Sequence, residues 1–80
     1  METSYAKAQM AISNLKAAIY EVLLESSDGM TNAQLGRSLG IYVGHKRHEG
    51  HISRTILALM EVEEVVKQDP TTKIWTLKER

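Results

Sequence analysis

The sequence has no cysteine, no phenylalanine, a single proline and no long apolar run among its 80 residues. Without cysteine, neither a disulfide nor a thiolate metal site can add to the stability of the fold. No stretch holds the roughly 20 apolar residues of a transmembrane helix, and the first residues lack the basic-then-apolar layout of a signal peptide. We therefore expect a single cytoplasmic domain without membrane contact, whose core is made of aliphatic side chains.

An excess of charge is also missing, because ten basic and ten acidic side chains cancel. The whole chain then has no bulk attraction for nucleic acid or for acidic membranes. Any binding to a polyanion must come from local segregation of charge. Segment 44–56 carries Lys46, Arg47 and Arg54 against one glutamate, whereas segment 61–64 carries three glutamates.

A long first helix is predicted over residues 4–26, which contain no proline or glycine and are rich in good helix formers. Its apolar stripe, at spacings of three and four, consists of Tyr5, Ala8, Ile12, Leu15, Ile19, Val22 and Leu23. Met10, Tyr20 and Leu24 lie off this stripe or at its edge. These three would form the contact of a homodimer through the N-terminal helix.

Two shorter helices are predicted next. "TNAQLGRSLG" can be capped by Thr31 or Asn32 and closed by Gly40. A third helix runs from about residue 50 to residue 63. Its expected core face consists of Ile52, Ile56, Leu59 and Met60.

The end of the chain has the pattern of a β-hairpin. The runs "VVKQ" and "KIWTL" are β-prone, and "DPTT" between them places Pro70 in the second position of a turn. Met30 begins a short extended link between the first two helices. The predicted fold is mainly α with a small β-hairpin (α+β), in the order helix, short strand, helix, helix, strand, strand.

Three stretches carry a resemblance to a known family: "MTNAQLGRSLGI", "HISRTILALMEVEEVVKQD" and "PTTKIWTL". They resemble the first helix, the recognition helix with the start of the wing, and the wing tip of winged helix-turn-helix DNA-binding domains of bacterial and archaeal type. The resemblance implies one winged-helix domain over 1–80, with an N-terminal helical extension at 1–14, a helix-turn-helix at 31–63 and a wing hairpin at 65–77. It further implies binding to double-stranded DNA as a small transcriptional regulator.

The sequence departs from the family pattern at two places. The link between the second and third helices is longer, because "YVGHKRHE" is inserted there. Where members commonly have a glycine between the recognition helix and the wing, this chain has Glu63 and Glu64.

The DNA-binding face is expected on the side of the third helix opposite its core face. At about 100° per residue, His51, Arg54, Ala58 and Glu61 lie there, with Ser53 on the flank. Arg54 is the strongest candidate, because its guanidinium can bind a guanine edge or a phosphate through two hydrogen bonds. The residues expected to contact DNA are His45, Lys46, Arg47, His48, His51, Ser53, Arg54, Arg37, Lys67, Thr71, Thr72 and Lys73.

All three histidines fall within "GHKRHEGH", residues 44–51. A loop could gather them with Glu49 around zinc, but on a helix the outer two lie about 240° apart, and Lys46 and Arg47 would place cations beside the metal. A histidine base needs an orienting carboxylate and a pocket, and so small a domain offers little concave volume. We expect no metal, no cofactor and no enzymatic activity. We interpret residues 44–51 as a basic lip before the third helix, with a solvated loop as the alternative.

A second function remains open at this stage. The fold could serve protein–protein contact, as an adaptor or as a subunit of a larger complex. Zero net charge, a wing without arginine and the acidic end of the third helix favour this alternative.

Overall fold

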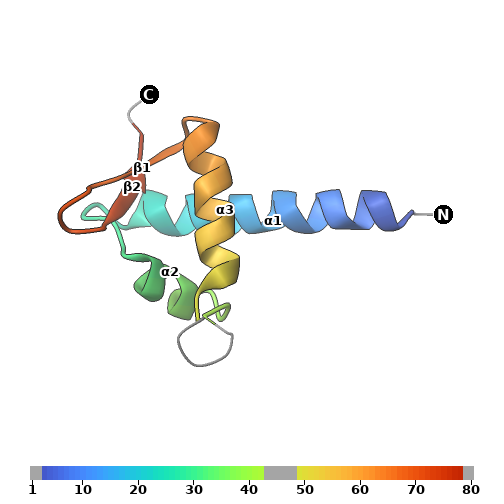
Figure 1. The fold of residues 1–80 in the computed structure, drawn as a ribbon, viewed down its shortest axis with the longest axis horizontal. Helices are drawn as coiled ribbons and strands as arrows, with labels where there is room; N and C mark the ends of the chain where they lie inside the picture. The colour runs from blue at the N-terminus through green and yellow to red at the C-terminus, as the bar shows by residue number, and fades with distance from the viewer. Residues whose placement is uncertain (1–2, 43–48, 79–80) are drawn as a thin grey trace.

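The protein is described by a computed structural model over residues 3–42 and 49–78. This part of the chain forms three helices and an antiparallel hairpin (Figure 1), which is the expected α+β class. The elements are α1 (Ser4–Glu25), α2 (Asn32–Ser38), α3 (His51–Val62), β1 (Val66–Gln68) and β2 (Trp75–Leu77).

Helix α1 is longer than the body against which it packs. The hydroxyl of Thr3 caps it by accepting a hydrogen bond from the backbone N–H of Ala6 at 3.0 Å. Ile19 and Leu23, in its second half, are buried in the core. The first half extends beyond the other elements (Figure 1). Tyr5, which we expected on the core stripe, is therefore 76% exposed, and this part of the prediction is wrong.

Strand β2 is paired along both of its edges. On one edge it is antiparallel to β1, with Val66 opposite Leu77 and Gln68 opposite Trp75. On the other edge Met30 donates to the carbonyl of Trp75 at 3.0 Å and accepts from its N–H at 2.7 Å. The predicted extended link at Met30 is confirmed, and it ties the hairpin to the chain that follows α1.

Helix α3 crosses α1 and also contacts α2 and β1 (Figure 1). Its buried face differs from the predicted one, because Ile52 and Leu59 are each 40% exposed. The residues that α3 buries are Ser53, Ile56, Leu57 and Met60. At about 100° per residue, the helix is rotated by roughly 60° from the expected orientation. The core is completed by Leu35, Val66 and Trp75.

Two glutamates, Glu63 and Glu64, follow the last residue of α3. Glu64 itself has the left-handed backbone conformation, with φ of 65°, so a non-glycine residue carries the turn into β1. Both carboxylates have cationic partners: Glu63 binds Lys16 of α1 at 2.6 Å, and Glu64 binds Lys78 at 3.0 Å. These ion pairs offset the unfavourable position of acidic groups at the C-terminal end of a helix.

Candidate functional site

The start of α3 depends on a glycine. Gly50 is the N-cap residue and has a φ of 84°, in the left-handed region. A Cβ atom at this position would lie 2.6 Å from Nδ2 of Asn32 and 2.9 Å from Cε1 of Tyr42. Both the backbone conformation and the available space therefore require glycine here.

A half-buried set of hydrogen bonds joins the first turns of α2 and α3. Ser53 donates through Oγ to Oδ1 of Asn32 at 2.7 Å, and Nδ2 of Asn32 donates to the carbonyl of Gly50 at 3.2 Å. Ser53 is fully buried, so its predicted position on the flank of the helix, within reach of DNA, is wrong. Its hydroxyl holds the two helices together instead. We refer to Asn32, Gly50 and Ser53 as the α2–α3 clamp.

Tyr42 fills the space beside this clamp. A Cβ atom at Gly36 would lie 3.1 Å from both Cβ of Tyr42 and Oγ of Ser53, so the small glycine of α2 allows these side chains to approach. The guanidinium carbon of Arg37 lies 4.6 Å from the centre of the Tyr42 ring. This cation–π contact holds the exposed Arg37 beside the start of α3.

The outward side of α3 carries the polar residues that the sequence predicted. His51, Arg54, Ala58 and Glu61 are all exposed. The Nη2 group of Arg54 donates to the backbone carbonyl of Glu49 at 3.3 Å. The guanidinium is therefore turned back toward the N-terminal end of α3, with most of its donors still directed to solvent.

The hairpin turn is shaped by Asp69. Its carboxylate accepts hydrogen bonds from the backbone N–H groups of Thr71 at 2.8 Å and Thr72 at 2.9 Å. These bonds, that from Thr72 first, lower the pKa of Asp69 below its usual value. Lys73 completes the turn with a φ of 67°, and its N–H donates to the carbonyl of Asp69 at 2.8 Å. Asp69 thus has a structural role at the tip.

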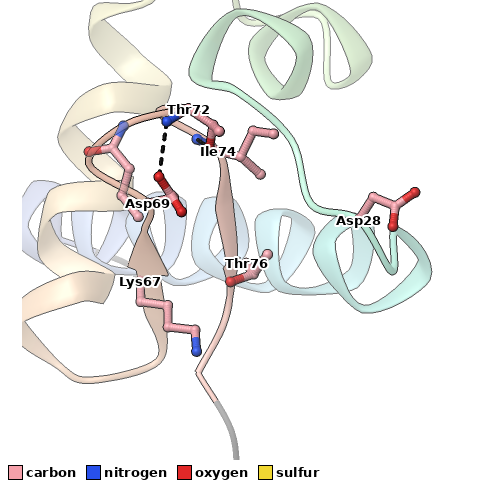
Figure 2. Close-up of a pocket in the computed structure, with 7 residues that line it drawn as sticks. Asp28, Lys67, Asp69, Thr72, Ile74 and Thr76 are labelled. Carbon is pink, nitrogen blue, oxygen red and sulfur yellow. Dashed lines mark hydrogen bonds between the residues drawn. The ribbon is translucent and has the colours of Figure 1, made fainter.

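An open hollow of about 430 Å³ lies between the hairpin and the chain that follows α1 (Figure 2). Asp28 lines one side of it, with Lys67 and Thr72 on the hairpin side. Its lining contains no histidine or cysteine. Lys67 lines it together with two carboxylates, those of Asp28 and Asp69.

The predicted contact residues that the structure describes fall into two separate groups. Arg37 lies on α2 and stacks on Tyr42 beside the α2–α3 clamp, and His51 and Arg54 lie in the first turn of α3. The exposed hairpin residues of the predicted set form a separate group: Lys67, Thr71, Thr72 and Lys73.

Four predicted contact residues, His45, Lys46, Arg47 and His48, lie outside the described residues, as does most of the histidine cluster. Within residues 3–42 and 49–78, no three acidic or histidine side chains come together in a way that could hold a metal ion. Sequence reasoning missed Tyr42 and the role of Asn32. The available signal was the pair Gly36 and Gly50, since small residues on two adjoining segments allow a close approach between them.

Comparisons of this chain with protein-family models, with curated proteins and with solved structures found no match. In the part of the chain that the structure describes, no helix has the length and apolarity needed to cross a membrane.

Proposed function

We propose that this chain is a winged-helix DNA-binding domain, acting as a small transcriptional regulator that reads duplex DNA with α3. The order of elements supports this proposal: α1, an extended bridge at Met30, α2, α3 and the β1–β2 hairpin follow one another as the family resemblance implies. In this assignment α3 is the recognition helix and the hairpin is the wing.

The observation that carries the proposal is the distribution of charge along α3. Arg54 and Arg37 are exposed at its N-terminal end, where a recognition helix contacts base edges and phosphates. Glu63 and Glu64 lie at the opposite end and are paired with lysines. A duplex that approaches the N-terminal end therefore meets these cations and avoids the carboxylates of Glu63 and Glu64.

The backbone at the start of α3 adds to this surface. The N-cap residue Gly50 makes no side-chain cap hydrogen bond, and the positive end of the dipole of α3 lies at the same end of the helix as Arg54, which favours an anion there. Lys46 and Arg47 of the basic lip would add further phosphate contacts, as would Lys67 and Lys73 of the wing.

Titration of the 15N-labelled protein with duplex DNA at low salt tests the proposal. We expect shifts of the amide resonances at residues 45–58 and in the hairpin, with the amides of the first half of α1 unchanged. The absence of shifts with several unrelated duplexes at low salt would refute DNA binding, because the electrostatic part of the affinity is independent of sequence.

Arg54→Ala separates a base contact from a general effect of charge. It should weaken binding to a preferred sequence by roughly ten-fold or more and reduce discrimination between sequences. Lys46→Ala should weaken all duplexes similarly and lower the salt slope by about one. Lys78→Ala removes one positive charge near the C-terminal end of α3, where Lys78 binds Glu64, and serves as the matched control with little expected effect.

The alternative function, contact with another protein, is favoured by one observation. Val62 is 82% exposed on α3, next in sequence to the acidic residues that end this helix. A partner protein would bind this region, and DNA would not. Shifts confined to residues 58–64 on addition of a candidate protein, with none on addition of DNA, would favour this function.

A further inference from the structure

Helix α1 carries a second stripe of residues in addition to its core stripe. Ala6, Met10, Ser13, Ala17, Tyr20 and Leu24 follow one another at spacings of four, three, four, three and four. This is the heptad spacing by which two helices pack side by side in a coiled coil. At about 100° per residue the stripe lies roughly 120° around the helix from the buried Ile19 and Leu23. We call these six residues the α1 seam.

The α1 seam is accessible in the folded chain. Met10 is 51% exposed and Leu24 is 52% exposed. Ser13 and Ala17, at its centre, are also exposed. Ala6 and Tyr20 are half-buried, and Tyr20 packs against the core on one side. An apolar stripe of about 27 Å, from residue 6 to residue 24 at 1.5 Å per residue, is thus open to a partner.

We propose that the α1 seam is a homodimer interface in which two copies of α1 pack antiparallel about a two-fold axis at the level of Leu15. The register follows from size. Ala6 of one copy faces Leu24 of the other, Met10 faces Tyr20, and Ser13 faces Ala17. With these pairs the two ends of the seam are equivalent, so the helix axes are not forced apart at one end only.

A parallel arrangement fits the same residues poorly. It would place Ala6, Ser13 and Ala17 against their own copies, and Tyr20 and Leu24 against theirs. The helices would touch at one end and be held apart at the other, which loses packing contacts. The small residue at one end of the seam therefore meets the large residue at the other end only when the two helices are antiparallel.

The flanking charges agree with the antiparallel register. Lys7 and Glu21 are exposed on the same flank of the seam, and no described residue forms an ion pair with either. In the antiparallel dimer Lys7 of each copy lies beside Glu21 of the other, which gives two ion pairs across the interface. Lys16, on the opposite flank near the axis, is bound to Glu63 at 2.6 Å and so is directed toward α3.

The dimer should be weak and dependent on concentration. Six seam residues from each chain are far fewer than the roughly 20–30 residues per side of a standard interface, so we expect a dissociation constant on the order of micromolar. Sedimentation equilibrium of the full chain without DNA, over roughly 1 to 300 µM, should show a monomer–dimer equilibrium. A monomer at every concentration would overturn the proposal, whether or not the protein binds DNA.

Ala17→Glu tests the location of the interface. It places two carboxylates in the centre of the seam and should weaken the dimer by roughly ten-fold or more. Ala11→Glu makes the same change at an exposed position of α1 outside the seam and should leave the dimer unchanged. Circular dichroism shows whether each variant is folded. Equal weakening by the two folded variants would overturn the assignment of the seam.

Two further experiments test the direction of the helices. Lys7→Glu and Glu21→Lys should each weaken the dimer, and the double variant should restore it. Because the chain has no cysteine, single cysteines report proximity cleanly. An oxidised mixture of Ala6→Cys and Leu24→Cys proteins should form the mixed disulfide, since a disulfide needs Cα atoms within about 7 Å. Ala6→Cys alone should stay uncrosslinked, because two copies of residue 6 are about 27 Å apart. Efficient self-crosslinking of Ala6→Cys would overturn the antiparallel register.

Discussion

Replacing Gly50 by alanine should destabilise the protein much more than the same change at Gly40. Both glycines have left-handed φ values, 84° and 72° respectively. Their surroundings differ, because a Cβ at Gly50 would lie 2.6 Å from Asn32 and 2.9 Å from Tyr42, while a Cβ at Gly40 would have no heavy atom within 4 Å. Both variants carry the cost of a left-handed backbone, and only Gly50→Ala adds steric overlap. Comparing the two therefore measures the cost of the overlap at the start of α3.

The magnitudes follow from these two terms. A non-glycine residue in the left-handed region costs about 1–2 kcal/mol, and the lower entropy of the unfolded alanine chain returns about 0.4–1 kcal/mol. Gly40→Ala should then cost about 1 kcal/mol. At Gly50 the overlap adds about 1–3 kcal/mol, as in overpacked cores. Asn32 cannot simply move aside, because it bonds both Gly50 and Ser53.

Urea unfolding of the two variants, followed by circular dichroism, measures the difference. For a domain of 80 residues the total stability is on the order of 4–12 kcal/mol, so the loss at Gly50 is a large fraction of it. A thermal scan should place Gly50→Ala at least about 5 °C below Gly40→Ala. Equal stabilities, within about 0.5 kcal/mol, would refute the steric account and the tight packing of the α2–α3 clamp.

Three smaller predictions follow from single contacts. Ser53→Ala should lower the free energy of unfolding by about 0.5–1.5 kcal/mol, because the half-buried amide of Asn32 loses a hydrogen bond; urea unfolding measures this, and an unchanged or higher free energy of unfolding would contradict it. Glu64→Gly should raise the thermal midpoint, since glycine adopts the left-handed conformation without strain; a lower midpoint would contradict it. The turn hydrogen bonds from Thr72 and Thr71 that lower the pKa of Asp69 contribute stability that is complete above about pH 4 and is lost as the pH falls through the folded-state pKa. Asp69→Asn should remove this part of the acid dependence, as measured by the thermal midpoint against pH, and an unchanged profile would contradict it.

The helices and the hairpin could be predicted because their signals are local. The absence of proline and glycine predicted a first helix over 4–26, and α1 spans Ser4–Glu25. The hydroxyl of Thr31 accepts from the N–H of Gln34, and the Gln34 side chain accepts from the N–H of Thr31. This capping box fixes the start of α2 within four residues of sequence. Such signals need no knowledge of distant parts of the chain.

The orientation of α3 could not be predicted in the same way. The run "ILALM" at residues 56–60 is apolar around the whole helix, so its periodicity does not choose between the face with Leu57 and the face with Leu59. The choice depends on Ser53, which is buried because its partner Asn32 comes from α2, 21 residues earlier. A polar residue whose partner is distant in sequence looks like a surface residue until the fold is known.

Charged groups hold the C-terminal end of α3 and uncharged groups hold its N-terminal end, in a chain whose net charge is zero. At the C-terminal end Lys16 and Lys78 are paired with glutamates. At the N-terminal end the α2–α3 clamp uses only uncharged groups, and Arg54 contacts the backbone there through a hydrogen bond to the carbonyl of Glu49. Arg54 remains exposed beside the clamp. A net charge of zero therefore does not count against the proposed binding to DNA, because Lys16 and Lys78 pair with glutamates at the C-terminal end of α3 while Arg54 stays exposed at its N-terminal end.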